Sequence, residues 1–111
     1  MCGIFAVIGS REVSSLLIDG LKKLEYRGYD SAGIATIDNL NNDQIGHLNV
    51  IKAKGKLTNL SNLIKKKPPT GRVGIGHTRW ATHGKPNERN AHPHLDFSGQ
   101  IAVVQLSLIH I

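Results

Sequence analysis

Cysteine is nearly absent from this sequence: one occurs among 111 residues, at position 2. A single cysteine cannot form an internal disulfide, which excludes a disulfide-stabilised secreted domain and suits a reducing compartment. Aromatic residues are also scarce, at 5% of the chain, so the core of one domain of this length must consist mainly of Ile, Leu and Val.

Long apolar segments are absent as well. No run approaches the ~20 consecutive apolar residues that span a bilayer. The N-terminal stretch MCGIFAVIG lacks the basic residues that open a signal peptide, and Gly3 and Gly9 interrupt its apolar run. We therefore expect a cytoplasmic protein with no membrane partner.

Acidic residues are outnumbered, with 8 Asp and Glu against 14 Lys and Arg, and the net charge is +6. Such an excess is typical of proteins that bind nucleic acids. Lys65, Lys66 and Lys67, however, directly precede two prolines, where basic residues favour a helix C-terminus. The sequence contains no nucleic-acid-binding motif. We interpret the lysines as a solvated helix end and expect no nucleic-acid partner.

The hydrophobic pattern predicts strands and helices in one domain. Residues 2–8 are expected to form a buried strand that ends at Gly9. A helix over 11–24 should follow, with Ser10 as its N-cap and Glu12 in its first turn. The residues that recur at helical spacing on its apolar face are Val13, Leu16, Leu17, Leu21 and Leu24.

The rest of the pattern predicts a hairpin, a second helix and further strands. In order, we expect a loop at 25–33, paired strands at 33–38 and 48–53 joined by a turn at 38–43, a helix through Leu57, Leu60 and Ile64, a strand at 72–80, a polar loop at 81–99 and a strand at 100–104. This irregular alternation favours an α+β sandwich over a doubly wound sheet.

Cys2 has two interpretations on the residues alone. It can be a small apolar side chain in a strand. It can also be a nucleophile, because removal of Met1 would place its thiol and a free α-amino group on the same residue. An α-amino group with a pKa near ~8 can take the proton from a thiol of similar pKa. Gly3 leaves room for a substrate beside the sulfur.

Three stretches bear on this choice: MCGIF at the start, LEYRGYDSAG at 24–33 and GHTRWATHGKPNERNAHPH at 76–94. Together they resemble the glutaminase domain of class II glutamine amidotransferases, over residues 1 to about 104. The residues of the last two stretches are similar to the amino-sugar branch of that family rather than to its phosphoribosyl-transferring branch. The resemblance implies a partial N-terminal-nucleophile fold, an αββα sandwich.

The resemblance also implies a reaction. Cys2 would attack the side-chain amide of glutamine, form a glutamyl thioester and release ammonia, with no cofactor. The ammonia would serve glucosamine 6-phosphate synthesis from fructose 6-phosphate, which would bind only to a separate isomerase domain. A homo-oligomeric parent enzyme is expected.

Further site residues follow from the same resemblance. Arg79 has the charge and the bidentate geometry to hold the α-carboxylate of glutamine. Thr82 resembles a threonine that contacts glutamine. Trp80 resembles a residue that covers the nucleophile and gates the ammonia path, and it could be a core aromatic at the same time.

Other matched residues have less specific roles. His83 and His92 resemble histidines of the glutamine site. Arg27 resembles an arginine near the cysteine that couples the site to sugar binding, with a structural loop arginine as the alternative. Tyr29 and Asp30 are expected to organise this loop rather than to take part in chemistry.

Histidines at positions 77, 83, 92 and 94 raise a metal site as an alternative. Their spacing matches neither a zinc finger nor the helical H-E-x-x-H motif. We expect no metal and interpret His77 and His94 as hydrogen-bonding residues of the site wall.

The pattern departs from the family at its end. Leu106 and Ser107 occupy the positions where the resemblance predicts the Asn-Gly pair of the oxyanion hole. The final letters LSLIHI match the translation of a transposon-end sequencing adapter. We therefore expect residues 1–104 to be the N-terminal part of the amidotransferase domain, residues 105–111 to be a non-native tail, and this chain to be inactive alone. A biological truncation is the alternative.

Two other functions compete with this one. A basic, non-enzymatic module would bind an anionic partner in a salt-sensitive manner and would not need Cys2. A conventional Cys–His hydrolase would use an imidazole as its base and would tolerate an extended N-terminus.

Overall fold

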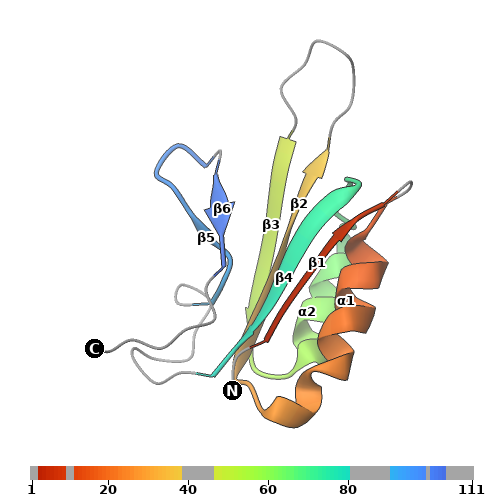
Figure 1. The fold of residues 1–111 in the computed structure, drawn as a ribbon, viewed down its shortest axis with the longest axis vertical. Helices are drawn as coiled ribbons and strands as arrows, with labels where there is room; N and C mark the ends of the chain where they lie inside the picture. The colour runs from red at the N-terminus through yellow and green to blue at the C-terminus, as the bar shows by residue number, and fades with distance from the viewer. Residues whose placement is uncertain (1–2, 10–11, 39–46, 81–90, 100, 105–111) are drawn as a thin grey trace.

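A four-stranded antiparallel sheet lies at the centre of the molecule, with helices on one face and a short two-stranded sheet on the other side (Figure 1). The structure is a computed structural model, and it describes residues 3–9, 12–38, 47–80, 91–99 and 101–104. This arrangement confirms the expected α+β class and the start of a sandwich.

The elements follow one another in the order of the sequence. They are β1 (Gly3–Ile8), α1 (Ser14–Lys23), the 3-10 turn η1 (Glu25–Arg27), β2 (Ser31–Asp38), β3 (His47–Lys54), α2 (Leu57–Lys66), β4 (Val73–Arg79), β5 (His94–Leu95) and β6 (Ala102–Val103). The main sheet has the order β1-β4-β2-β3, and each neighbouring pair is antiparallel.

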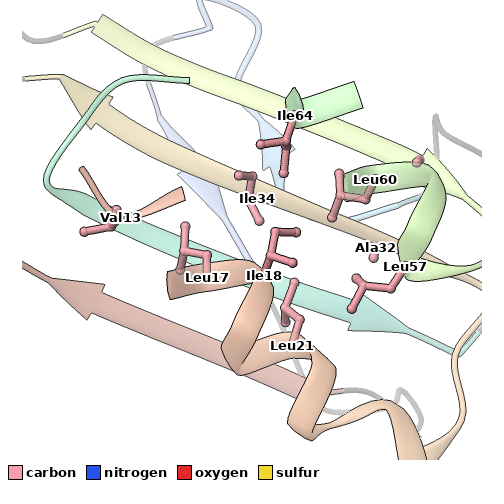
Figure 2. Packing of buried hydrophobic residues seen from close by; sticks show 10 residues of the cluster. Val13, Leu17, Ile18, Leu21, Ala32, Ile34, Leu57, Leu60 and Ile64 are labelled. Carbon is pink, nitrogen blue, oxygen red and sulfur yellow. The ribbon is translucent and has the colours of Figure 1, made fainter. Parts of the chain in front are cut away.

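Helices α1 and α2 cover the same face of the sheet, α1 over β1 and β4 and α2 over β2 and β3 (Figure 1). Between them and the sheet lies one cluster of aliphatic side chains, which Figure 2 shows from close by. The fully buried members include Val13, Leu17, Leu21, Ile34 and Leu60. The prediction that aliphatic residues supply the core is confirmed.

Glycines in β4 let helix α1 approach the sheet closely. A Cβ on Gly74 would lie 2.6 Å from Cδ1 of Leu17, and one on Gly76 would lie 3.1 Å from Cδ1 of Leu21. Leu17 and Leu21 therefore pack directly on the strand backbone. The Gly-x-Gly spacing of β4 follows from the alternation of a strand, in which residues two apart share a face.

The second helix ends where the sequence predicts. Leu57, Leu60 and Ile64 are buried at helical spacing, and the helix stops before the prolines. Lys65 and Lys66 are exposed in its last turn, which confirms the interpretation of a solvated helix end. Neither helix in the described part of the chain has the length and apolar character needed to cross a membrane.

The predicted start of the first helix is wrong. The helix begins at Ser14 with Val13 at the N-cap, and no acidic residue lies in its first turn. The preceding chain is tied to the entrance of β4 instead. The backbone N–H of Gly9 donates to Arg72 O at 2.7 Å, and that of Val13 donates to Gly71 O at 3.0 Å. Ser10, the expected cap, lies outside the described residues.

Three further expectations need correction. Leu16 is 39% exposed, and Ile18 takes its place in the core. Strand β1 is only half buried, because the helices cover one of its faces. Strand β2 begins at Ser31, two residues before the predicted start. The pairing of β2 with β3 confirms the hairpin, and its turn lies mostly outside the described residues.

The second sheet begins inside the predicted polar loop. β5 pairs with β6 in antiparallel fashion, and Asp96 closes the connection by accepting the backbone N–H of Ile101 at 2.8 Å. Ile101 and Ala102 then lie across a cavity of about 280 Å³ from Ile37 and Ile75 of the main sheet. The loop prediction is therefore wrong at 94–95, which form strand β5. Asp96 then stabilises the turn that follows.

Leu17→Ala should destabilise the chain by about 2–5 kcal/mol, because it removes a fully buried side chain and leaves a cavity beneath α1. Leu16→Ala, one residue earlier in the same helix, should cost about 0.5 kcal/mol. Urea unfolding followed by circular dichroism measures both. Equal costs for the two substitutions would contradict the assigned helix face.

Candidate functional site

The face of the sheet opposite the helices carries a row of polar residues. In the register, His77 of β4 lies opposite Gly33 of β2, and Gly33 lies opposite Lys52 of β3. Directly opposed residues share one face of a sheet. Arg79 lies two residues beyond His77 on the same face and pairs with Ser31. One end of the sheet thus gathers several cationic or titratable side chains.

A stack of three imidazole rings lies on this face. The ring of buried His77 stacks on that of His92, with centroids 4.1 Å apart and an interplanar angle of 18°. The ring of His94 lies against His92, with centroids 4.4 Å apart and a tilt of 53°. Ala91 and Pro93, the two sequence neighbours of His92, are both buried and hold this segment against the rest of the structure. His77 and His94, interpreted from the sequence as wall residues, thus both contact the ring of His92.

Burial keeps His92, the middle ring of this stack, uncharged near neutral pH. Desolvation is the largest cause that lowers the pKa of His92 to about 4, and the neighbouring imidazoles of His77 and His94 lower it further. Arg79 and Lys52 act in the same direction. The pKa of His94 is also lowered, by desolvation first and then by the same two cations. At neutral pH, both His92 and His94 are therefore neutral groups beside a fixed guanidinium.

The loop at 25–30 is fastened to the end of the sheet. The backbone N–H of Asp30 donates to Arg79 O at 2.8 Å, and Asp30 O accepts the N–H of Gly55 at 2.8 Å. Gly28 turns the chain with a φ of 84°. The loop that contains Arg27 is thereby placed next to the strand that contains Arg79.

Tyr29 joins this loop to helix α2. Its hydroxyl donates to Glu25 Oε2 at 2.9 Å and accepts the backbone N–H of Leu57 at 2.6 Å. Burial is the largest cause that raises the pKa of Tyr29, so the hydroxyl keeps the proton that it donates. The bond also satisfies the first N–H of α2, whose N-cap Lys56 offers no side-chain acceptor. The expectation that Tyr29 organises the loop is confirmed.

Trp80 stands at the rim of an open cavity of about 640 Å³. Half of its side chain is exposed, so it is not a core aromatic in this structure. The side chains that line it are acidic (Glu25 and Asp30), basic (Lys54 and Lys56) and aromatic (Tyr29 and Trp80).

The structure brings together some of the residues predicted from the sequence. Arg79 and His92 lie on one face at the same end of the sheet, and Trp80 follows Arg79. Cys2, Thr82 and His83 lie outside the described residues, and for Arg27 only the backbone is described. Gly3, which follows Cys2 in the sequence, pairs with Thr78 beside Arg79. Among the described residues, no group of three His, Cys, Asp or Glu side chains has an arrangement that could hold a metal ion.

Comparison with known proteins identifies relatives over almost the whole chain. The chain is 56% identical over 110 residues to the glutamine–fructose-6-phosphate aminotransferase (isomerizing) of Gloeobacter violaceus, which covers 98% of the chain and 17% of that relative. The enzymes of the same name from Clostridium acetobutylicum and Agrobacterium fabrum are 51% and 55% identical over 109 residues, with the same coverage. No protein-family model matches the chain.

Over the stretch that it shares with them, the chain belongs to the family of glutamine–fructose-6-phosphate aminotransferases. It spans about a sixth of the length of these curated relatives (17%).

A solved structure supports the same fold. The glutamine phosphoribosylpyrophosphate amidotransferase from B. subtilis, complexed with ADP and GMP, matches 86% of this chain and 19% of its own, with a TM-score of 0.67 and 27% identity. The described sheet and helices thus match part of an N-terminal-nucleophile amidotransferase. This match confirms the fold implied by the resemblance to class II glutamine amidotransferases.

Sequence reasoning did not single out Lys52 or Gly33 for the site. Strand alternation contained the signal for Lys52, because residues 48, 50, 52 and 54 share the face away from the helices. A glycine inside a strand marks a close approach of another backbone, and this signal was available for Gly33. The contact between Tyr29 and Leu57 joins residues 28 apart and has no local signature.

Tyr29→Phe should lower the free energy of unfolding by about 1–2 kcal/mol, because it leaves the Leu57 N–H without its acceptor and removes the bond to Glu25. Thermal or urea unfolding measures this loss. Tyr26→Phe is the matched control, because Tyr26 is 85% exposed and should tolerate the change. If both variants lose equal stability, the proposed role of the Tyr29 hydroxyl is wrong.

The lowered pKa of His92 predicts a stability that depends on pH. The unfolded chain binds a proton at this residue near pH 6.5, whereas the folded chain does so only near pH 4. Above pH 6.5, His92 is neutral in both states and does not oppose folding. As the pH falls from 6.5 toward 4, protonation of His92 favours the unfolded chain, so the free energy of unfolding decreases. Urea unfolding at pH 7.5 and 5 should show a larger loss for the wild type than for His92→Gln. Parallel losses would mean that His92 titrates normally in the folded chain.

Proposed function

We propose that this chain provides the glutamine-binding and ammonia-releasing part of a glutamine–fructose-6-phosphate aminotransferase. The observation that carries the proposal is the identity of 51–56% to these enzymes over 98% of the chain. The position of Arg79 beside His92 at one end of the sheet supports it, because both residues were predicted as glutamine ligands.

In this proposal Cys2 is the nucleophile, exposed as the first residue once Met1 is removed. Its α-amino group takes the thiol proton, and the thiolate attacks the side-chain carbonyl carbon of glutamine. The C–N bond breaks, the same proton returns to the leaving nitrogen, and ammonia departs. Water then hydrolyses the glutamyl thioester to glutamate and regenerates the thiol.

Arg79 supplies the charge that holds the α-carboxylate of glutamine. A guanidinium presents parallel N–H donors that match both carboxylate oxygens. His92, which is neutral because burial lowers its pKa to about 4, has one nitrogen that donates and one that accepts. Such a group suits an uncharged part of the substrate. Thr82 and His83 are proposed as further glutamine contacts.

The use of the ammonia belongs to the part of the relatives that this chain does not match. The relatives' name indicates transfer to fructose 6-phosphate, and we propose that this sugar binds outside residues 1–104. Trp80, which lines the cavity beside the loop at 25–30, is proposed to cover the path between the two sites. Arg27 in the same loop is proposed to couple them.

Turnover by this chain is expected to be low. Leu106 and Ser107 occupy the positions of the expected Asn-Gly pair, and loss of one oxyanion-hole donor typically costs about 10²–10³ in rate. A reactive glutamine analogue depends less on this stabilisation, since its electrophile is already activated.

The glutamine analogue 6-diazo-5-oxonorleucine should therefore label Cys2 in the purified chain, while glutamate release from glutamine stays near background. Intact-mass spectrometry measures the labelling, and a coupled glutamate assay measures turnover. Arg79→Ala should slow labelling at least about tenfold, because a tenfold change corresponds to the loss of one hydrogen bond to a charged group.

Three controls accompany this test. Arg72→Ala removes an exposed arginine just before the same strand and should leave labelling unchanged. Cys2→Ala and a chain that retains Met1 should not react. Labelling that persists with Met1 in place would favour a Cys–His hydrolase, and clear glutamate release would refute the expected inactivity.

A further inference from the structure

We infer that Gly33 is a positioning residue of the site: its missing side chain lets the backbone of His92 rest on strand β2, which places the His92 ring on His77. The link to glutamine binding rests on the proposed function of His92, whereas the geometry does not. The role differs from that of the glycines in β4, because Gly33 lies on the opposite face of the sheet.

A Cβ built on Gly33 would overlap the carbonyl oxygen of His92 and would lie 3.0 Å from Cδ of Pro93. Both neighbours belong to the backbone or to a proline ring, which cannot move aside by a simple rotation. Any larger residue at position 33 must therefore displace the segment that carries His92.

The register explains why this contact matters for the site. Gly33 lies between His77 and Lys52 in one row across three strands. The carbonyl oxygen of His92 lies over Gly33, in the middle of this row. The ring of His92 stacks on the ring of His77 at one end of the row, with their centroids 4.1 Å apart. The height of the segment above the sheet thus sets the ring stack and the distance from His92 to the cations Arg79 and Lys52, which influence its pKa.

Ordinary strand energetics predict the reverse effect. Glycine inside a strand is less favourable than alanine by roughly 0.5–1 kcal/mol, so Gly→Ala usually stabilises a strand when space is available. No positive φ requires glycine at position 33. The reason for glycine here is the approach of the His92 backbone.

The test is Gly33→Ala, with the imidazole resonances of His92 followed by NMR from pH 3.5 to 8. We expect the midpoint of His92 to rise from about 4 toward its ordinary value of 6.5 as the ring leaves the stack. Gly76→Ala is the matched control, since it adds the same methyl to the neighbouring strand on the helix face, where only the flexible side chain of Leu21 lies nearby. It should leave the midpoint unchanged.

A midpoint that stays near 4 in Gly33→Ala would overturn the inference, as would equal shifts in both variants. If Gly33→Ala does not fold, the wild type decides. A nuclear Overhauser contact between the Hα protons of Gly33 and the Hδ protons of Pro93 is expected, and its absence would refute the close approach. These measurements use no substrate, so a failure of the glutaminase proposal in the Cys2 labelling experiment remains distinguishable from a failure here.

Discussion

Strand β4 is the element on which both the core and the site depend, because its alternating side chains serve the two faces of the sheet. Toward the helices it presents Gly74 and Gly76, whose small size lets α1 approach. Toward the opposite face it presents His77 and Arg79. A shift of the register by one residue would exchange these faces. Core packing therefore fixes the face of the sheet on which Arg79 lies.

Much of the fold could be predicted, because the chain follows local rules in its helices and strands. Leu57, Leu60 and Ile64 mark the buried face of α2 at helical spacing, and the prolines mark its end. The errors occur where long-range bonds override local signals. Ser10 is a suitable cap residue by type, yet α1 begins only at Ser14, and long-range backbone bonds from Gly9 and Val13 hold the described chain before it.

The candidate site was predictable in its residues more than in its contacts. The motif HTRWATH identified Arg79 and Trp80, and strand alternation places Arg79 on the face of His77. The stack on His92 could not be predicted, because it requires the chain to return across the sheet after residues 81–90 and to descend onto Gly33. Periodicity describes single elements, whereas this contact depends on the height of one segment above another.

The charges of this site follow from its packing. Burial of His92 is the largest cause that lowers its pKa, and the ring of His77, whose centroid lies 4.1 Å away, lowers it further. The cations Arg79 and Lys52 act in the same direction. The imidazole of His92 therefore remains neutral, as its pKa of about 4 indicates. The guanidinium and the ammonium group can attract a carboxylate, while the neutral ring of His92 offers one donor and one acceptor. Gly33 allows the ring stack to form, because it has no side chain to hold the His92 backbone away from β2. The absence of one methyl group thus helps to place a neutral recognition group beside the charged ones at this end of the sheet.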